Sequence, residues 1–487
     1  MQPLQITIIG GGFCGAITAV NLLRDNTQSL HINIINKGNP IARGVAYSPN
    51  SSSLLLNVPS GKMSAFPDEP DHFVNWLKKQ PEFRGIANED LADGFAPREL
   101  YGNYLTHLWQ EALKTREQNS VLTVYEDYAY NVVEADDRYY IYLKNNPVLA
   151  SDVVVLATGN ALPRLPSGVP VAFSMGPKYF GDPWTIDSIG KLDPGGDVLI
   201  IGNGLTMADT VVALVEAGFK NTIYTVSPHG YNINIFKENK APYEDRDTGS
   251  LQLNNSGLSG LLATLNKHRR SAQASESSAY LIVDSLRPYT QQIWLSFSLE
   301  EKRLFLKYLR HLWGSARHRL PANTHNLIAG LYATDQLITY KGKVVKVIDD
   351  DDLVLVTLDC GGELKLLTVQ RIINCTGPES NPKLSSNALL RTLAASGLIC
   401  ADDLGMGIKA NPSDGCIISL SGEHKPNLFT IGSNLKGILW ESTAVPELSV
   451  QAKNLAALLA EKARLHQLDS QMLKTQGTEK QNIVSLG

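Results

Sequence analysis

The residues QITIIGGGFCGAITAVNLL, 5–23, decide the fold of this chain. The apolar run before Gly10 predicts a buried strand, and the apolar residues after Gly15 recur at helical spacing. The next segment, HINIINKG at 31–38, predicts a second strand. A strand, a glycine turn, a helix and a strand in this order form a parallel βαβ unit, so the chain opens with an α/β domain.

The glycines between the first strand and the helix follow the pattern G-x-G-x-x-G. Gly10 permits the sharp turn, Gly12 lets a pyrophosphate approach the backbone, and Gly15 allows close packing of helix on strand. Phe13 and Cys14 stand between them, at the start of a helix whose amides and dipole attract phosphate. The pattern predicts a dinucleotide site; the alternative is a glycine-rich turn that binds no ligand.

The end of the second strand departs from the usual pattern. An Asp or Glu normally binds the adenosine ribose hydroxyls there, but this chain has Asn36 followed by Lys37. An asparagine can still form a hydrogen bond with a hydroxyl, although without charge assistance. We therefore expect weaker nucleotide affinity than a carboxylate would give.

The same organisation occurs a second time in DVLIIGNGLTMADTVVALVEAGFKNTIYTVS, 197–227. Gly202 and Gly204 keep the first two glycines, whereas Met207 replaces the third. The natural ligand of this turn is a nicotinamide dinucleotide, and Arg or Lys after the next strand would indicate NADP. The strand leads into SPHG, 227–230, so two interpretations stay open: a working NAD(P)H site, with NADH and NADPH unresolved, or a degenerate lobe kept for structure.

The duplicated motif predicts two Rossmann-like dinucleotide-binding domains in an α/β fold, with the FAD domain discontinuous, the NAD(P) domain inserted and a helical cap. Ala157, Thr158 and Gly159 close a buried strand before the junction, and 375–377 repeat this pattern more weakly. Small residues suit such crossovers because two connections and a cofactor crowd there. The expected ranges are 1–165 for the first part of the FAD domain, 185–335 for the NAD(P) domain with its helical insertion at about 242–326, 336–468 for the second part of the FAD domain, and 469–487 for a polar, frayed tail.

The composition excludes several classes of function. A formal net charge of -4 gives no broad basic surface for nucleic acid. The five cysteines form no C-x-x-C pair, the ten histidines form no H-E-x-x-H motif, and no G-x-S-x-G nucleophile elbow occurs, so we expect neither a metal site nor hydrolase chemistry. Because no stretch reaches the roughly 20 apolar residues of a membrane helix, and no basic residue precedes the N-terminal apolar run, we expect a cytoplasmic protein without a membrane partner.

Several longer blocks carry a resemblance to a known family. They are GGGFCG, RGVAYS, LLLNVPSGKMSAFPDEPDHFVNWL, FAPRELYGNYL, LATGNALP and GILWESTAVPELSVQA. Together the blocks resemble the bacterial FAD/NAD(P)-binding proteins whose characterised relatives include the FAD-dependent urate hydroxylase and the aspartate N-monooxygenase. The resemblance extends over nearly the whole chain.

The resemblance implies which residues face FAD. Met63 and Ser64 are expected nearest the flavin ring, although the stretch 59–70 could instead be a packing loop. Gly432 ends a late strand before a helix whose N-terminus would point at the flavin pyrimidine carbonyl. The other residues implied at the cofactor are Arg43, Asn57, Arg98 and Tyr101, with Trp440, Thr443 and Ala444 across from the ring. Relatives typically carry an acidic residue in place of Asn36 and Ser-Arg-x-Gly in place of SPHG, 227–230.

The resemblance favours a flavin monooxygenase-like oxidoreductase, in which NAD(P)H reduces FAD and molecular oxygen is used to hydroxylate a small molecule. The helical cap near Trp294 to Leu320 is a candidate lid over the substrate. The alternatives are a flavin dehydrogenase or oxidase, and a non-catalytic FAD-binding sensor with a degenerate nicotinamide site. No catalytic acid or base, substrate or oligomeric state follows from the sequence.

Overall fold

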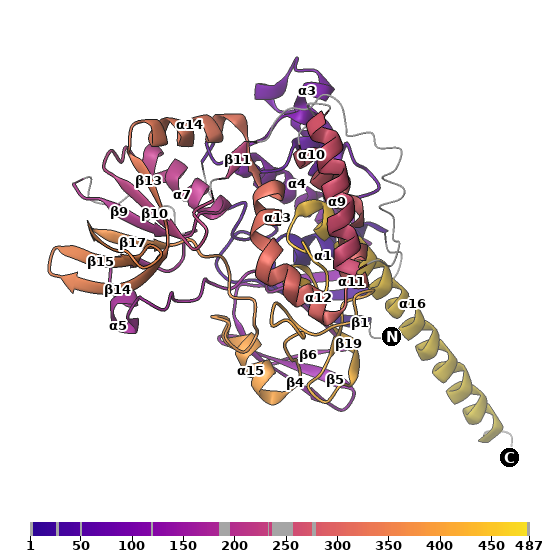
Figure 1. Ribbon diagram of the computed structural model, residues 1–487. Coiled ribbons are helices and arrows are strands. Elements are labelled where there is room, and N and C mark those ends of the chain that lie inside the picture. Colours follow the sequence, from indigo (N-terminus) through magenta and orange to yellow (C-terminus); the bar gives the residue numbers. More distant parts are fainter. Residues whose placement is uncertain are drawn as a thin grey trace. The chain divides into compact units, whose positions relative to one another are not determined.

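The computed structural model describes residues 3–25, 29–48, 51–117, 120–184, 195–231, 233–235, 257–274 and 279–484. The chain divides into two compact units, called lobe 1 and lobe 2 (Figure 1). Lobe 1 comprises Met1–Asn50, Val58–Asn160 and Ser380–Gly487, and lobe 2 comprises Ser51–Asn57 and Ala161–Glu379. Each lobe is described by itself.

Lobe 1 is built on a six-stranded sheet in the order β18-β19-β7-β1-β2-β3. β1 pairs in parallel with β2 and β7, and only β18 runs antiparallel to its neighbour. The central strands are apolar on both faces because both faces are covered. The bounds are β1 Leu4–Ile9, β2 Leu30–Ile35, β3 Val121–Tyr125, β7 Val153–Leu156, β18 Cys416–Ile418 and β19 His424–Thr430.

Helix α1, Phe13–Asp25, packs against α4, Arg98–Thr115, and against α16, Val445–Val484. The segment 469–487, expected as a frayed tail, is thus helical as far as Val484, and 485–487 lie outside the described residues. Pro97, whose ring fixes φ near -57°, precedes α4 and lets the helix begin at Arg98.

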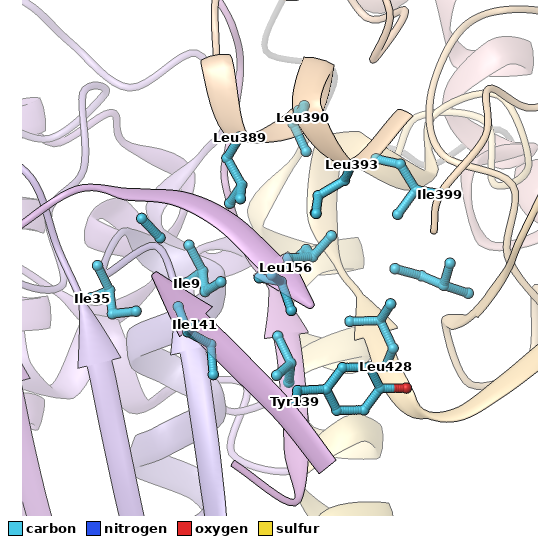
Figure 2. Close-up of a cluster of buried hydrophobic side chains, with 14 of the residues drawn as sticks. Ile9, Ile35, Tyr139, Ile141, Leu156, Leu389, Leu390, Leu393, Ile399 and Leu428 are labelled. Carbon is cyan, nitrogen blue, oxygen red and sulfur yellow. The ribbon is translucent and has the colours of Figure 1, made fainter. Parts of the chain in front are cut away.

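The six-stranded sheet also carries a cluster of buried hydrophobic side chains (Figure 2). Ile9, Leu156 and Leu428 of the sheet pack with Ile141 and with Leu393. The elements that contribute are β4 Ala129–Ala135, β5 Arg138–Leu143, β6 Leu149–Ser151 and α15 Ala388–Ser396. The cluster holds residues from both ends of the chain together, which makes lobe 1 discontinuous in sequence.

The excursion between β2 and β3 is a set of short helices on an aromatic cluster. Phe73, Tyr101 and Tyr104 are fully buried and contact one another edge-on or tilted, with ring centroids 4.9 to 5.6 Å apart. Such contacts give a segment rich in Pro, Gly and Ser a core of its own. The short elements are η1 Ser60–Lys62, α2 His72–Leu77, η2 Pro81–Phe83 and α3 Asn88–Asp93.

Lobe 2 contains a five-stranded parallel sheet in the order β13-β10-β9-β17-β8. A three-stranded antiparallel sheet in the order β14-β15-β16 lies between β13 and β17 in the chain, and Figure 1 labels its strands β14 and β15. The bounds are β8 Tyr179–Phe180, β9 Val198–Ile201, β10 Ile223–Ser227, β13 Leu337–Lys341, β14 Lys343–Asp350, β15 Leu353–Asp359, β16 Leu364–Val369 and β17 Arg371–Asn374, with helices α5 Val171–Ser174, α7 Leu205–Glu216 and α14 Ala322–Ala333.

The lobe boundaries differ from those expected. The second part of the first domain is expected from 336, whereas lobe 2 extends to Glu379. The reason is pairing: β13 lies beside β10 and β17 beside β9, so both complete the second sheet. Strand pairing over more than 100 residues leaves no local signal in the sequence. The expected α/β class is confirmed, with a parallel sheet in lobe 2 and, in lobe 1, a parallel sheet that has one antiparallel edge strand.

The insertion expected at about 242–326 is mainly helical over its described residues, and 242–256 and 275–278 lie outside them. Ser298 and Glu301 form a capping box at the start of α12. Buried Trp294 packs against Phe305, with ring centroids 5.7 Å apart. The elements are β11 Asn234–Ile235, α9 Gly257–Ala274, α10 Ala279–Ser285, η3 Arg287–Tyr289, α11 Thr290–Ser296, α12 Leu299–Leu304, the π-helical turn η4 Phe305–Leu309, α13 Arg310–Arg317 and β12 Arg319–Leu320.

Candidate functional site

The first glycine turn is held by backbone contacts that exclude side chains. Gly10 has φ +116°, and a Cβ there would lie 2.1 Å from the carbonyl oxygen of Ala157. A Cβ on Gly15 would lie 2.0 Å from the carbonyl oxygen of Gly10. Both distances are shorter than any real contact, so these two glycines are required by the fold itself. They bring β1, α1 and the end of β7 to one point.

Gly12 differs from these two glycines. A Cβ on Gly12 would meet only Gly44, at an ordinary 3.5 Å from its Cα. Ala42, two residues before Gly44, donates its amide to the carbonyl of Gly11 at 2.8 Å. The loop after β2 therefore crosses the glycine turn closely but leaves room at Gly12. Phe13 starts α1 and is buried.

Asn36 and Lys37 lie where the sequence places them, at the end of β2, but their side chains already have partners. The Asn36 amide donates to the carbonyl of Asn39 at 2.7 Å. The Lys37 ammonium lies 4.9 Å from the centre of the Tyr128 ring. Both side chains thus stabilise the loop after β2, which an acidic residue at 36 could not do in the same way because it has no donor.

Arg43 is directed to helix α4. Its Nε donates to the Thr106 hydroxyl at 3.0 Å, and its guanidinium also donates to Asn103. There it lines a surface cleft of about 470 Å³ together with Trp76 and His107. The neighbouring residues of the predicted set, Arg98 and Tyr101, lie on the first turn of α4 and are buried.

Tyr101 has a polar atom in an apolar environment. Its hydroxyl is buried and has no hydrogen-bond partner among the described residues, while its ring lies 4.7 Å from that of Tyr47 and 6.5 Å from that of Phe13. Burial raises the pKa of Tyr47 to about 12, although the nearby charge of Arg98 acts in the opposite direction. A buried hydroxyl without a partner is costly, so a bound group that accepts its hydrogen bond would stabilise this region.

Met63 and Ser64 are both buried in lobe 1. The Ser64 hydroxyl contacts the carbonyls of Phe66 and Glu69 at 2.9 and 2.7 Å, which closes the turn before α2. This hydroxyl therefore has a structural role whether or not a cofactor lies nearby. Asn57 belongs to the segment assigned to lobe 2.

The crossover after β7 is fixed by a residue that sequence reasoning missed. Asn434 donates from Nδ2 to the Leu156 carbonyl at 3.3 Å and to the Thr158 hydroxyl at 3.0 Å. Gly159 has φ +67° and no atom near its absent side chain. The available signal was the position of Asn434 just after a buried strand, the same feature that makes Gly432 a candidate.

Gly432 joins the first turn of α1 to the first two turns of α16. A Cβ there would lie 2.8 Å from the Cys14 Sγ, and the Gly432 amide donates to the Gln451 side chain at 3.1 Å. The Ser442 hydroxyl donates to the Gly432 carbonyl at 2.7 Å and accepts from Gln451 at 2.8 Å. Burial raises the pKa of the Cys14 thiol to about 12, so it stays neutral.

The residues before α16 lie on a tight turn. Glu441 adopts a left-handed φ of +63°, and the Thr443 amide donates to its carbonyl at 2.6 Å. Trp440 is buried, Thr443 is exposed, and the Ala444 carbonyl accepts the first amides of the helix. The predicted residues Gly432, Trp440, Thr443 and Ala444 thus flank the N-terminus of α16.

The second glycine turn reproduces the first in its backbone. Gly202 has φ +113°, and a Cβ there would lie 2.3 Å from the carbonyl oxygen of Cys375. Gly204 is the N-cap of α7, and no atom lies within 4 Å of its absent side chain. Met207, in the third position, is buried and lines a cavity of about 410 Å³ with His325 and Tyr332.

The described ranges contain neither a candidate metal centre nor a helix that could span a membrane. No group of three or more His, Cys, Asp or Glu residues there is arranged to hold a metal ion. Within the same ranges, no helix combines the length and the apolar character needed to cross a membrane.

The chain is similar to known proteins both in the segment that contains the first glycine turn and in its overall fold. Residues 7–161 match the family model described as FAD-NAD(P)-binding. A comparison with curated proteins finds no match to this chain.

Among solved structures, a Kutzneria sp. 744 ornithine N-hydroxylase with reduced FAD, NADP+ and L-ornithine is similar at 15% identity and a TM-score of 0.66, over 95% of this chain and 100% of that one. The ornithine hydroxylase of Pseudomonas aeruginosa has 15% identity, a TM-score of 0.66 and coverage of 94% and 99%. The L-lysine 6-monooxygenase of Pseudomonas syringae has 15% identity, a TM-score of 0.63 and coverage of 94% and 99%. These likenesses establish that the chain has the two-lobed Rossmann-type fold of such flavoproteins.

Proposed function

We propose that this chain is an FAD-dependent oxidoreductase of the monooxygenase type, which uses NAD(P)H to reduce FAD and hydroxylates a small molecule. The observation that carries the proposal is the pair of glycine turns, one in each lobe, with the same backbone contacts at Gly10 and Gly202. Lobe 1 would bind FAD and lobe 2 the nicotinamide dinucleotide. A cytoplasmic location is part of the same proposal.

The residues present in lobe 1 fit FAD. Gly12 leaves backbone room for a pyrophosphate at the N-terminus of α1, where unpaired amides attract an anion. Arg98 would add positive charge, and the buried Tyr101 hydroxyl lacks a partner among the described residues. When bound, FAD supplies the hydride acceptance and the reaction with oxygen.

The chain's own residues must orient the ligands and exclude water. Hydrogen bonds among Gly432, Ser442 and Gln451 hold the start of α16 in place, and Cys14 of α1 lies against Gly432. The neutral Cys14 thiol adds no charge there. In lobe 2 the open space at Gly204 would admit a second pyrophosphate.

The substrates to screen first follow from the similar proteins. Three of the similar structures are of ornithine, lysine and cadaverine monooxygenases, which favours a primary amine. The sequence resemblance adds aspartate and urate. A dehydrogenase or oxidase, and a sensor without nicotinamide binding, are the alternatives that the test must separate.

The test begins with FAD-loaded protein mixed without oxygen with NADPH and, separately, with NADH, while the flavin band near ~450 nm is followed. We expect at least one of them to bleach the band. The reduced protein is then exposed to oxygen with each candidate substrate, and hydroxylated product and hydrogen peroxide are measured. Product formation supports a monooxygenase, peroxide alone supports an oxidase, and no bleaching by either nicotinamide contradicts the proposal and supports the sensor.

A further inference from the structure

We propose that His229 and His311 together form the binding site for the 2′-phosphate of NADPH, and that this pair makes lobe 2 select NADPH over NADH. The inference rests on the proposed function, because it names the nicotinamide form that reduces the flavin. Neither histidine belongs to the Arg- or Lys-based pattern that indicates NADP in sequence.

The two imidazoles come from separate elements and meet beyond the end of β10. The His229 ring lies parallel to that of Tyr231, with centroids 5.4 Å apart and 9° between planes. The His311 ring, on α13, lies 4.1 Å from the His229 ring. Both side chains remain open to solvent, so a ligand can reach them.

A hydrogen bond ties Tyr231, whose ring lies against that of His229, to the second glycine turn. Asn203, between Gly202 and Gly204, donates from Nδ2 to the Tyr231 carbonyl at 2.6 Å. Its buried Oδ1 has no partner among the described residues. In Rossmann-like folds the pyrophosphate lies at this turn and the adenosine ribose at the end of the second strand, which here is the place of His229.

The charges around the pair suit an anion. Arg310 precedes His311 on α13, and Lys341, paired with Ser227 at the end of β13, lies against Gly230. The charged groups that lower the pKa of His311 are His229 and Arg310.

Partial burial lowers the pKa of His311, and the positive charges of His229 and Arg310 lower it further. A bound phosphate dianion would reverse this effect by favouring the protonated form of His311. Binding would therefore take up protons, and affinity should fall as the pH rises from 6 to 8. Below pH ~6 the phosphate itself gains a proton, so the preference should be greatest near that pH.

The test uses two probes that differ only in the 2′-phosphate: adenosine 2′,5′-bisphosphate and AMP. Their binding to the FAD-loaded protein is measured by titration calorimetry at pH 6, 7 and 8, in two buffers with different ionisation heats to count protons. We expect the bisphosphate to bind more tightly, with proton uptake. His229→Gln and His311→Gln should each weaken its binding by about tenfold or more, because a charge-assisted hydrogen bond is lost, and should leave AMP unchanged.

His424→Gln, an exposed position on β19 of lobe 1, is the matched control and should bind both probes as the unmodified protein does. Equal affinity for the two probes would overturn the inference. A preference for the bisphosphate that survives in both histidine variants would also overturn it. So would a preference that is lost only in Arg310→Gln or Lys341→Gln. Flavin bleaching separates the two proposals. Equal bleaching by NADH and NADPH keeps the function and removes the histidine site, whereas histidine-dependent probe binding without bleaching keeps the site and removes the function.

Discussion

The first and second glycine turns have the same backbone conformation but differ in the side chain at their third position. In both, the first glycine has a strongly positive φ, and its amide donates to the end of the next strand, at 2.9 Å for Gly10 and 2.8 Å for Gly202. The third position differs: Gly15 has no space for a Cβ, whereas Met207 projects into the core and lines a cavity. The first glycine thus serves the fold, and the third depends on local packing. The second has room for a side chain, and we propose that it serves a ligand instead.

The largest expected effect is at the shared first position. Gly10→Ala and Gly202→Ala each place a Cβ within 2.1 and 2.3 Å of a carbonyl oxygen, at a φ that alanine avoids. Backbone strain and overpacking together should destabilise the affected lobe by roughly 2 to 6 kcal/mol. Hydrogen exchange of peptides from each lobe would measure this separately. Gly330→Ala on α14, where nothing lies within 4 Å, is the control and should be harmless.

The second glycines should separate cofactor from fold. Gly12→Ala meets only an ordinary 3.5 Å contact, and Gly204→Ala meets none. We expect both proteins to fold, with Gly12→Ala losing FAD affinity by roughly 10- to 100-fold because the new Cβ occupies the pyrophosphate position. FAD content after dialysis measures this loss. If Gly12→Ala retains FAD fully, the first turn is not the cofactor site.

The third position should respond to a truncation in lobe 2. Met207 is 2% exposed and packs with Val211 and Ile328. Met207→Ala should cost about 2 to 5 kcal/mol, near the lower end because a cavity already lies beside it. Denaturant-dependent hydrogen exchange should place the loss in lobe 2 alone. A loss shared equally by lobe 1 would show that the two lobes unfold together.

The smallest expected effect concerns the two crossovers, which both use a buried asparagine. Asn434 holds Thr158 in lobe 1, and Asn374 accepts the Thr376 hydroxyl at 2.7 Å in lobe 2. Thr158→Val and Thr376→Val should each cost about 1 kcal/mol, since other hydrogen bonds of each asparagine remain. Thermal unfolding of both variants beside the unmodified protein would measure the losses, and a much larger loss at Thr158 would indicate a further role for that crossover.

Local patterns predicted the strands, both turns and the fold class, because glycine spacing and apolar periodicity are short-range signals. They could not place β13 and β17, whose partners in the sheet lie far away in sequence. At the site, Gly10 and Gly15 follow from the motif alone. The roles of Asn434 and His311 do not, since each depends on a contact with a distant segment.

The most direct test of a division between an FAD lobe and a nicotinamide lobe is anaerobic flavin reduction in Gly204→Ala, loaded with FAD and mixed with NADPH. We expect FAD to stay bound, because lobe 1 is unchanged, and bleaching of the ~450 nm band to become much slower or to require far more NADPH. Bleaching at the rate and NADPH dependence of the unmodified protein would contradict the proposed role of the second turn.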